Sequence, residues 1–385
     1  MATDQPDTPM WVGFNARLFR FASSPLPKQK ICYFPQIDES PTSSSVVRET
    51  MNMAKKVAEE CMQQYVSVTY DLAIAKVAFP IQEEDSSYSN IFIQLGSFHI
   101  LLSYFKAIGK LIDNSGGPFV LTETGIIAQG SLLGFLQGKH YNRCKRIHPI
   151  FSVALESLHF KSFLKTIDKE LSEETSQFVQ LLVSNPQYET ISWNESITSL
   201  FEKYESYSSD TLHGRHGKTA QFWMCYIRLI SLYHTFERAI RTGDYKLFIS
   251  CLPEMMKIFF ALNHQNYARW LVYFHDRLIR MEETHPGIEQ DFEAGILSIR
   301  RTSKPFSRQP IDITLEQTIN ADAAGSCTGN SEFTVSIKIQ SQLFVYIFHQ
   351  LVLPHLPIPY LEDSVGQWAY IFELQLFRIF WRQRE

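Results

Sequence analysis

Two short apolar runs, each ending in polar residues, form the clearest pattern in the chain. Residues 65–70 form a short run with the character of an apolar strand, and they end at Asp71. Residues 91–95 are mostly apolar and lead through Gly96 into residues 98–112, where apolar side chains recur at helical spacing. The sequence therefore predicts two strands, the second of which runs directly into an amphipathic helix.

Helical spacing dominates the rest of the chain. A short edge strand is expected at residues 31–34 and a late strand at 297–302. The remaining apolar segments predict helices at residues 46–63, 122–137, 151–183, 194–207, 222–242, 245–262, 263–281 and 311–324, and mostly helix from 331 onward. The expected fold class is α/β or α+β: a mixed-sheet core with a large inserted helical region, helix-dominated overall.

This pattern divides the chain into four expected parts. Residues 1–60 form an irregular N-terminal segment and a helix, and residues 61–150 form the α/β core with Asp71 and the turn at 96–99. Residues 151–290 are the helical insertion, and residues 291–385 carry the late strand, an acidic helix and C-terminal helices. No internal repeat or low-complexity tract interrupts this order.

The amino-acid composition is typical of a folded protein. Of the 385 residues, 45% are hydrophobic and 14% aromatic, enough for a sizeable core and too many for a disordered protein. The six cysteines lie far apart, with no paired spacing typical of zinc sites, which favours reduced thiols in the nucleus or cytoplasm. No apolar run is long enough to span a bilayer, so we expect an intracellular protein without a membrane partner.

Two acidic or ionisable side chains stand at the predicted strand ends. A carboxylate such as Asp71 at the end of a buried strand can present charge to a ligand or metal ion. The alternative is that Asp71 caps the following helix through backbone N–H groups. His99, at the first helical turn, is either a ligand partner of Asp71 or a hydrogen-bonded core or turn residue.

Two basic runs are candidates for contact with DNA or RNA, although the net charge of the chain is −4. The alternative for each run is an ordinary solvated surface. The candidate phosphate-binding cations are Lys139, Arg143, Lys145 and Arg146 in the first run, and Arg300, Arg301, Lys304 and Arg308 in the second. Nucleotide-binding glycine loops, nucleophile elbows and metalloprotease motifs are absent from the sequence, which argues against those enzyme classes.

Several longer motifs resemble a known family. They read Val68-Thr-Tyr-Asp71-Leu-Ala-Ile-Ala-Lys, Leu95-Gly-Ser-Phe-His99, Gly138-Lys-His-Tyr-Asn-Arg-Cys-Lys-Arg, Asn266-Tyr-Ala-Arg-Trp, Arg300-Arg-Thr-Ser-Lys-Pro-Phe-Ser-Arg and Ile311-Asp-Ile-Thr-Leu-Glu316-Gln-Thr-Ile-Asn320-Ala-Asp322. Together they resemble a large family, carried as a domain of unknown function, that is expanded in invertebrates such as cnidarians and insects and has fungal relatives. The resemblance covers nearly the whole chain.

The genomic scatter of that family resembles mobile elements, which implies a transposase-derived, ribonuclease-H-like core. Such a core uses converging carboxylates to hold two Mg²⁺ ions. Asp71, Glu316 and Asp322 would be the catalytic acids, and Asp71, His99 and Glu316 the metal ligands. Ser97 stands where a further acid is expected, and a hydroxyl cannot replace a carboxylate on Mg²⁺.

The resemblance therefore implies a degenerate nuclease core that leans away from enzymatic activity and binds nucleic acid. If the site were intact, the chain would be a Mg²⁺-dependent, transposase-like nuclease. The alternative is a protein-interaction or scaffold module with no catalytic site, suggested by the long aromatic helical region.

Overall fold

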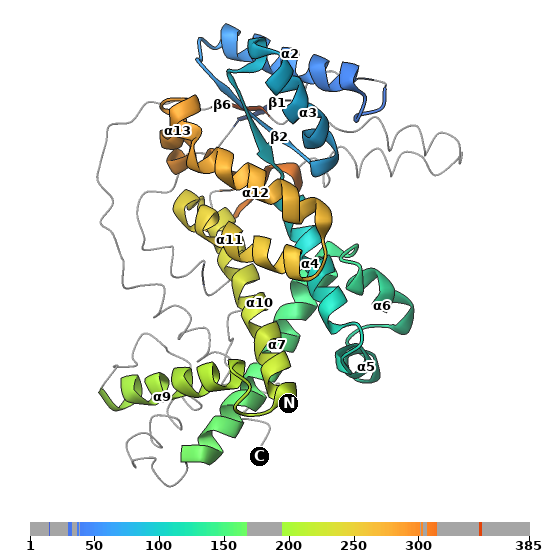
Figure 1. Cartoon of the computed structure of the whole chain (residues 1–385), viewed down its shortest axis with the longest axis vertical. Helices are drawn as coiled ribbons and strands as arrows, with labels where there is room; N and C mark the ends of the chain where they lie inside the picture. Colours follow the sequence, from blue (N-terminus) through green and yellow to red (C-terminus); the bar gives the residue numbers. More distant parts are fainter. Residues whose placement is uncertain are drawn as a thin grey trace, which may run out of the picture. The chain divides into compact units, whose positions relative to one another are not determined.

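Helices make up most of the computed structural model, which describes residues 15, 30–32, 37, 39–167, 195–300, 302, 306–313 and 346–348 (Figure 1). The chain divides into two compact units, each built from separate stretches of sequence. One unit contains Met1–Ser23, Asn142–Ser231 and His355–Glu385. The other contains Ser24–Tyr141 and Leu232–Pro354. We call them the first and the second unit.

The second unit contains the two strands that the sequence pattern predicts. Strand β2 (Val66–Tyr70) pairs in parallel with β3 (Ile91–Leu95), with Val66 opposite Ile91 and Tyr70 opposite Leu95. Every residue of β3 is buried, as expected for a strand covered on both faces. Helices α2 (Ser44–Glu60) and α3 (Leu72–Glu84) pack against this pair, which is joined through α3 and the short 3₁₀ turn η1 (Ser86–Tyr88). Both predicted strands are confirmed.

Helix α4 (Ser97–Ile112) follows β3 directly, as predicted, and two short helices come next. They are α5 (Gly117–Glu123) and α6 (Gln129–Leu136), where the pattern predicts one helix over residues 122–137. That prediction is wrong because Gly125 adopts a left-handed conformation, with φ of 71°, and ends the helical path. Helix α6 packs closely on α4, since a Cβ added at Gly109 would overlap the backbone of Leu136.

The later part of the second unit is an aromatic helical layer. The C-terminal end of α10 (Lys218–Thr242) leads into α11 (Tyr245–Ala261), which runs beside α12 (Gln265–Ile279) (Figure 1). Short turns follow, and then two small antiparallel sheets complete the described part. These turns and strands are α13 (Met281–Thr284), α14 (Ile288–Asp291), η3 (Phe292–Ile296), the pair β4 (Ser298–Arg300) and β5 (Arg308–Pro310), and the pair β1 (Lys30–Cys32) and β6 (Tyr346–Phe348).

The described part of the first unit is helical. Helix α7 (Tyr141–Ile167) contains Pro149 and begins ahead of the predicted start at residue 151. It packs with α9 (Glu195–Leu212) through a core of Phe163, Leu200 and Tyr204.

The fold class is therefore helix-dominated α+β. The described strands pair two by two, in three separate two-stranded sheets, and do not build the single mixed sheet that we expected as the core. Most of the helix predicted at 311–324, and nearly all of the chain after residue 331, lie outside the described residues.

Candidate functional site

Asp71 lies at the carboxyl end of β2, where a parallel pair of strands commonly presents a binding site. Its side chain accepts a hydrogen bond of 2.9 Å from the backbone N–H of Ile74, in the first turn of α3. This contact satisfies one of the N–H groups that a helix start leaves without a partner. The carboxylate of Asp71 therefore acts as a helix cap, which is the structural alternative that the sequence left open.

A second carboxylate caps the neighbouring helix from a distant part of the chain. Asp312 accepts hydrogen bonds of 3.1 Å from the backbone N–H groups of both Phe98 and His99, at the start of α4. Its Oδ2 also lies 2.9 Å from Nδ1 of His99. The residue at the N-cap position itself, Gly96, has no side chain that could supply these acceptors. Asp312 thus replaces the missing cap and holds the His99 ring against it.

Glycine is required at position 96 by this close approach. A Cβ added at Gly96 would overlap the carboxylate of Asp312. Asp312 is only 7% exposed, so its charge is matched by the two N–H groups, the helix dipole and the imidazole rather than by water. The turn that lacks an acid at Ser97 therefore does receive a carboxylate, from a residue that is not among the sequence-predicted site residues.

A buried tyrosine lies close to both capping carboxylates. Tyr267, in the first turns of α12, is hydrogen-bonded to Ser103, and burial raises the pKa of its hydroxyl, with smaller contributions from the negative charges of Asp312 and Asp71. The two carboxylates are therefore near enough to act on one phenol. Tyr267 opens the motif Asn266-Tyr-Ala-Arg-Trp, and Asn266 accepts a hydrogen bond of 2.7 Å from Lys76.

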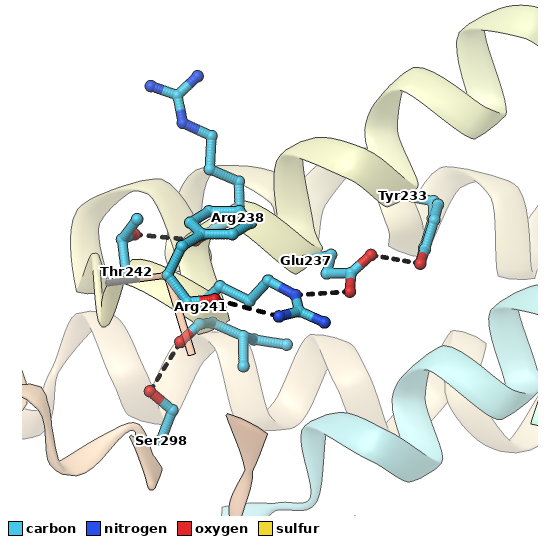
Figure 2. A network of polar contacts seen from close by, with 8 residues as sticks. Tyr233, Glu237, Arg238, Arg241, Thr242 and Ser298 are labelled. Atoms are coloured by element: carbon cyan, nitrogen blue, oxygen red, sulfur yellow. Dashed lines mark hydrogen bonds and ion pairs between the residues drawn. The ribbon is translucent and has the colours of Figure 1, made fainter. Parts of the chain in front are cut away.

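The segment that carries Asp312 is held in place by a buried polar network on α10 (Figure 2). Glu237, 4% exposed, accepts hydrogen bonds from the hydroxyl of Tyr233 and, at 2.8 Å, from Nε of Arg241. Arg241 in turn donates to the carbonyl oxygen of Phe306 at 3.1 Å and stacks over its ring. The network therefore fixes the chain just before β5, six residues ahead of Asp312.

Only some of the predicted metal ligands lie among the described residues. Asp71 and His99 are described, whereas Glu316 and Asp322 lie outside the described residues. Within the described ranges, no three His, Cys, Asp or Glu side chains gather closely enough to hold a metal ion. As far as the described residues go, the geometry gives Asp71 and Asp312 a role in helix capping, and the Mg²⁺ site stays a prediction.

Two arginines of the second basic run are buried, although an exposed position was expected for them. Arg300 and Arg308 are 7% and 3% exposed, so neither can lie on an open phosphate-binding face. The sequence left a phosphate-contacting face and an ordinary solvated surface open for both residues, but both side chains are buried where β4 pairs with β5. Arg301 and Lys304 lie outside the described residues.

The first basic run keeps exposed cations. Lys139, Arg143 and Arg146 are exposed and Lys145 is half-buried. From residue 124 to residue 155 the sequence contains four Lys or Arg residues and no Asp or Glu, so this stretch carries a local positive charge.

Two further exposed lysines, which the sequence patterns did not single out, lie near Lys139 in the second unit. A Cβ added at Gly138 would lie 2.6 Å from the carbonyl oxygen of Leu102 and 2.8 Å from the backbone N of Lys106, so the loop carrying Lys139 packs directly on α4. On the same helix, Lys110 donates a hydrogen bond of 2.8 Å to the carbonyl oxygen of Leu262. Sequence alone could have suggested this pair, since residues 106 and 110 share one helical face.

The imidazole of His264 lies close enough to Lys106 and Lys110 to be affected by their positive charges. Partial burial lowers the pKa of its imidazole, and the charges of Lys106 and Lys110 act in the same direction. We call the group of Lys106, Lys110, Lys139 and His264 the α4 basic surface. Neither Lys106 nor Lys139 forms an ion pair with any residue in the described ranges.

If Asp71 acts only as a helix cap, its removal should cost little stability. Asp71→Ala is expected to lower the free energy of unfolding by about 1 kcal/mol, the usual value of a helix cap. Asp244→Ala is the matched control, because Asp244 makes the same 2.9 Å contact, to the backbone N–H of Leu247. Urea unfolding of both variants measures this. A loss at Asp71 that exceeds the control by several kcal/mol would mean that capping is not its main role.

Comparison with known proteins adds a family and no activity. No curated protein and no solved structure matches the chain significantly. Among the helices that the structure describes, none has the length and apolar character needed to cross a bilayer. The family model described as "Domain of unknown function (DUF8702)" matches residues 10–348, most of the sequence, and the chain therefore belongs to this family.

Proposed function

We propose that this protein binds nucleic acid through exposed cations and does not cleave it. The observation that carries the proposal is the α4 basic surface, in which Lys106 and Lys110 act on His264 and the loop carrying Lys139 packs on the same helix. Lysines without carboxylate partners are available to phosphate groups, and each neutralised phosphate releases counterions from the duplex. Arg143 and Arg146 on α7, in the first unit, are further exposed cations within the acid-free stretch of sequence.

The proposal includes a mobile-element origin and a degenerate ribonuclease-H-like core, as the family resemblance implies. Two features of the described residues support the loss of nuclease chemistry. Asp71 uses its carboxylate as a cap for α3, and Ser97 stands in place of an acid at the next strand end. A cap that is engaged with backbone N–H groups is a poor starting point for binding a hydrated Mg²⁺ ion.

Fluorescence anisotropy with a labelled DNA duplex tests the binding proposal across a salt series. The wild-type protein is expected to bind at low salt and to weaken steeply as salt rises. Replacing Lys106, Lys110 and Lys139 together by alanine is expected to reduce the slope of log K against log salt by about 2–3, since each cation contacts about one phosphate. A second variant, Arg143→Ala with Arg146→Ala, tests the α7 cations separately.

A matched control separates this effect from a general change in net charge. Its three lysines also lie in the second unit, but each one pairs with a glutamate; they are Lys56, Lys246 and Lys257. Replacing these by alanine is expected to leave DNA affinity and its salt slope nearly unchanged. If both triple variants lose affinity equally, the α4 basic surface is not the binding site.

A protein-interaction module is the second candidate, favoured by a separate apolar surface. Large apolar side chains on α5, α6 and the turn between them are open to solvent. Phe119 is 67% exposed, Leu133 65%, Val120 46% and Ile126 42%. Clustered exposed apolar groups of this kind mark interaction surfaces. An absence of DNA and RNA binding even at low salt would favour this candidate over the first.

A further inference from the structure

Two buried arginines face one another on the hairpin of β4 and β5. Arg300 and Arg308 are direct cross-strand partners, so their side chains leave the sheet on the same side. Like charges at such positions repel, and burial strengthens the repulsion because little water screens it. With exposures of 7% and 3%, the pair brings two guanidinium groups inside the second unit, where Nε of Arg300 donates to the carbonyl oxygen of Thr302 at 3.0 Å.

The hydrogen bonds of Arg308 leave one part of its guanidinium without an acceptor. Nε donates to the hydroxyl of Ser298 at 2.8 Å, and Nη2 donates to the carbonyl oxygens of Gly295 and Ser298. Nη1 is buried and has no hydrogen-bond partner. Buried donors without acceptors are rare in native proteins, and each one asks for an explanation such as a bound water or ion.

The charge of Arg308 is also unmatched by its contacts. All three acceptors around it are neutral oxygens, two from the backbone and one from a serine. Burial lowers the pKa of the Arg308 guanidinium to about 10, and the neighbouring charge of Arg300 adds to this effect. A buried charge is normally compensated by an opposite charge. An anion beside Nη1 would supply both the missing acceptor and the missing charge.

We propose that Arg300 and Arg308 bind a small oxyanion of the phosphate class, with Nη1 of Arg308 as one donor. The planar guanidinium suits tetrahedral oxyanions because its N–H groups match the spacing of their oxygens. The contacts to Ser298 and Gly295 hold the guanidinium plane fixed, so Nη1 is already oriented. The depth of the pair favours a small ion over a polymer backbone, and this site is therefore separate from the α4 basic surface.

Calorimetry and thermal unfolding of the 385-residue chain test this proposal. The protein is first exchanged into a chloride buffer, and inorganic phosphate or sulfate is then added at constant ionic strength. We expect saturable binding of about one ion per chain and a rise in Tm that follows the mass-action dependence of a native-state ligand. Chloride at the same ionic strength is expected to give neither effect. A wild-type protein that shows no phosphate- or sulfate-specific binding overturns the proposal.

Two arginine variants then locate the site. Arg308→Lys keeps the charge but removes the fork of donors, and is expected to weaken phosphate binding at least tenfold. Arg280→Lys is the control, because Arg280 is exposed and pairs with Asp276, and it is expected to bind as the wild type does. If Arg308→Lys does not fold, Arg300→Lys takes its place in the comparison. Equal binding by the control and the site variants overturns the assignment.

Measuring phosphate binding in the presence of DNA distinguishes binding at the buried arginine pair from binding at the protein surface. A saturating DNA duplex at constant ionic strength is expected to leave phosphate binding at the arginine pair unchanged. The triple alanine variant of the α4 basic surface is likewise expected to retain it. If DNA displaces phosphate in proportion to its own binding, the anion belongs to the nucleic-acid surface and the buried site is rejected.

Discussion

Asp312→Ala is expected to lower the free energy of unfolding by about 2–4 kcal/mol, the largest effect of any substitution at the strand-end turn. The substitution removes the acceptor of the N–H groups of Phe98 and His99 and the partner of the His99 ring. Water cannot easily replace a side chain that is only 7% exposed. Urea unfolding followed by circular dichroism measures the loss as a shift of the midpoint.

Two comparisons sharpen this expectation. Asp312→Asn keeps an amide oxygen that can accept one of the N–H bonds, and should lose distinctly less stability than the alanine variant. Glu254→Ala removes a carboxylate from an exposed pair with Lys257 and should cost no more than about 0.5 kcal/mol. If Asp312→Ala behaves like this surface control, the contact to α4 contributes little to the fold.

Glu237→Ala is expected to be at least as destabilising, with a loss of about 3–5 kcal/mol. The substitution leaves the guanidinium of Arg241, whose side chain is 15% exposed, without its carboxylate, and the hydroxyl of Tyr233 without its acceptor. Breaking one half of a buried ion pair is costly because the other charge stays desolvated. The same loss should loosen the contact between Arg241 and the carbonyl group of Phe306.

A double-mutant cycle tests whether the pair itself is responsible. The cycle uses Glu237→Gln, Arg241→Met and their combination; the double variant removes both charges at similar volume and should be more stable than Glu237→Gln alone. A coupling energy near zero would show that the two side chains act independently. Because Arg241 contacts Phe306, the cycle also reports on the segment that leads to Asp312.

Local sequence patterns predicted the strands and helices near Asp71 because each element's own residues determine it. The short run before Asp71 forms β2, and the apolar run 91–95 forms β3. The capping role of Asp71 was also within reach, since a cap and its helix are adjacent in sequence. By contrast, the single helix expected over 122–137 ignored the backbone of Gly125, whose positive φ ends one helix before the next begins.

Contacts between distant parts of the chain could not be predicted in this way. Asp312 reaches the first turn of α4 across more than two hundred residues, and no spacing rule relates the two positions. Asp312 stands between Ile311 and Ile313, a pattern that fits an exposed acid on an alternating segment as well as a buried one. The burial of Arg300 and Arg308 likewise follows from the pairing of β4 with β5. The charge of an individual residue does not predict this pairing.

The cap that Asp312 supplies also sets an order of events during synthesis. Residues leave the ribosome from the N-terminus, so α4 emerges long before the residue that completes its first turn. At translation rates of about 5–20 residues per second, the interval between residues 97 and 312 lasts about 10–40 s. Throughout that interval the N–H groups of Phe98 and His99 lack the carboxylate that accepts from them in the finished chain, so the first turn of α4 gains its cap only after Asp312 has been synthesised.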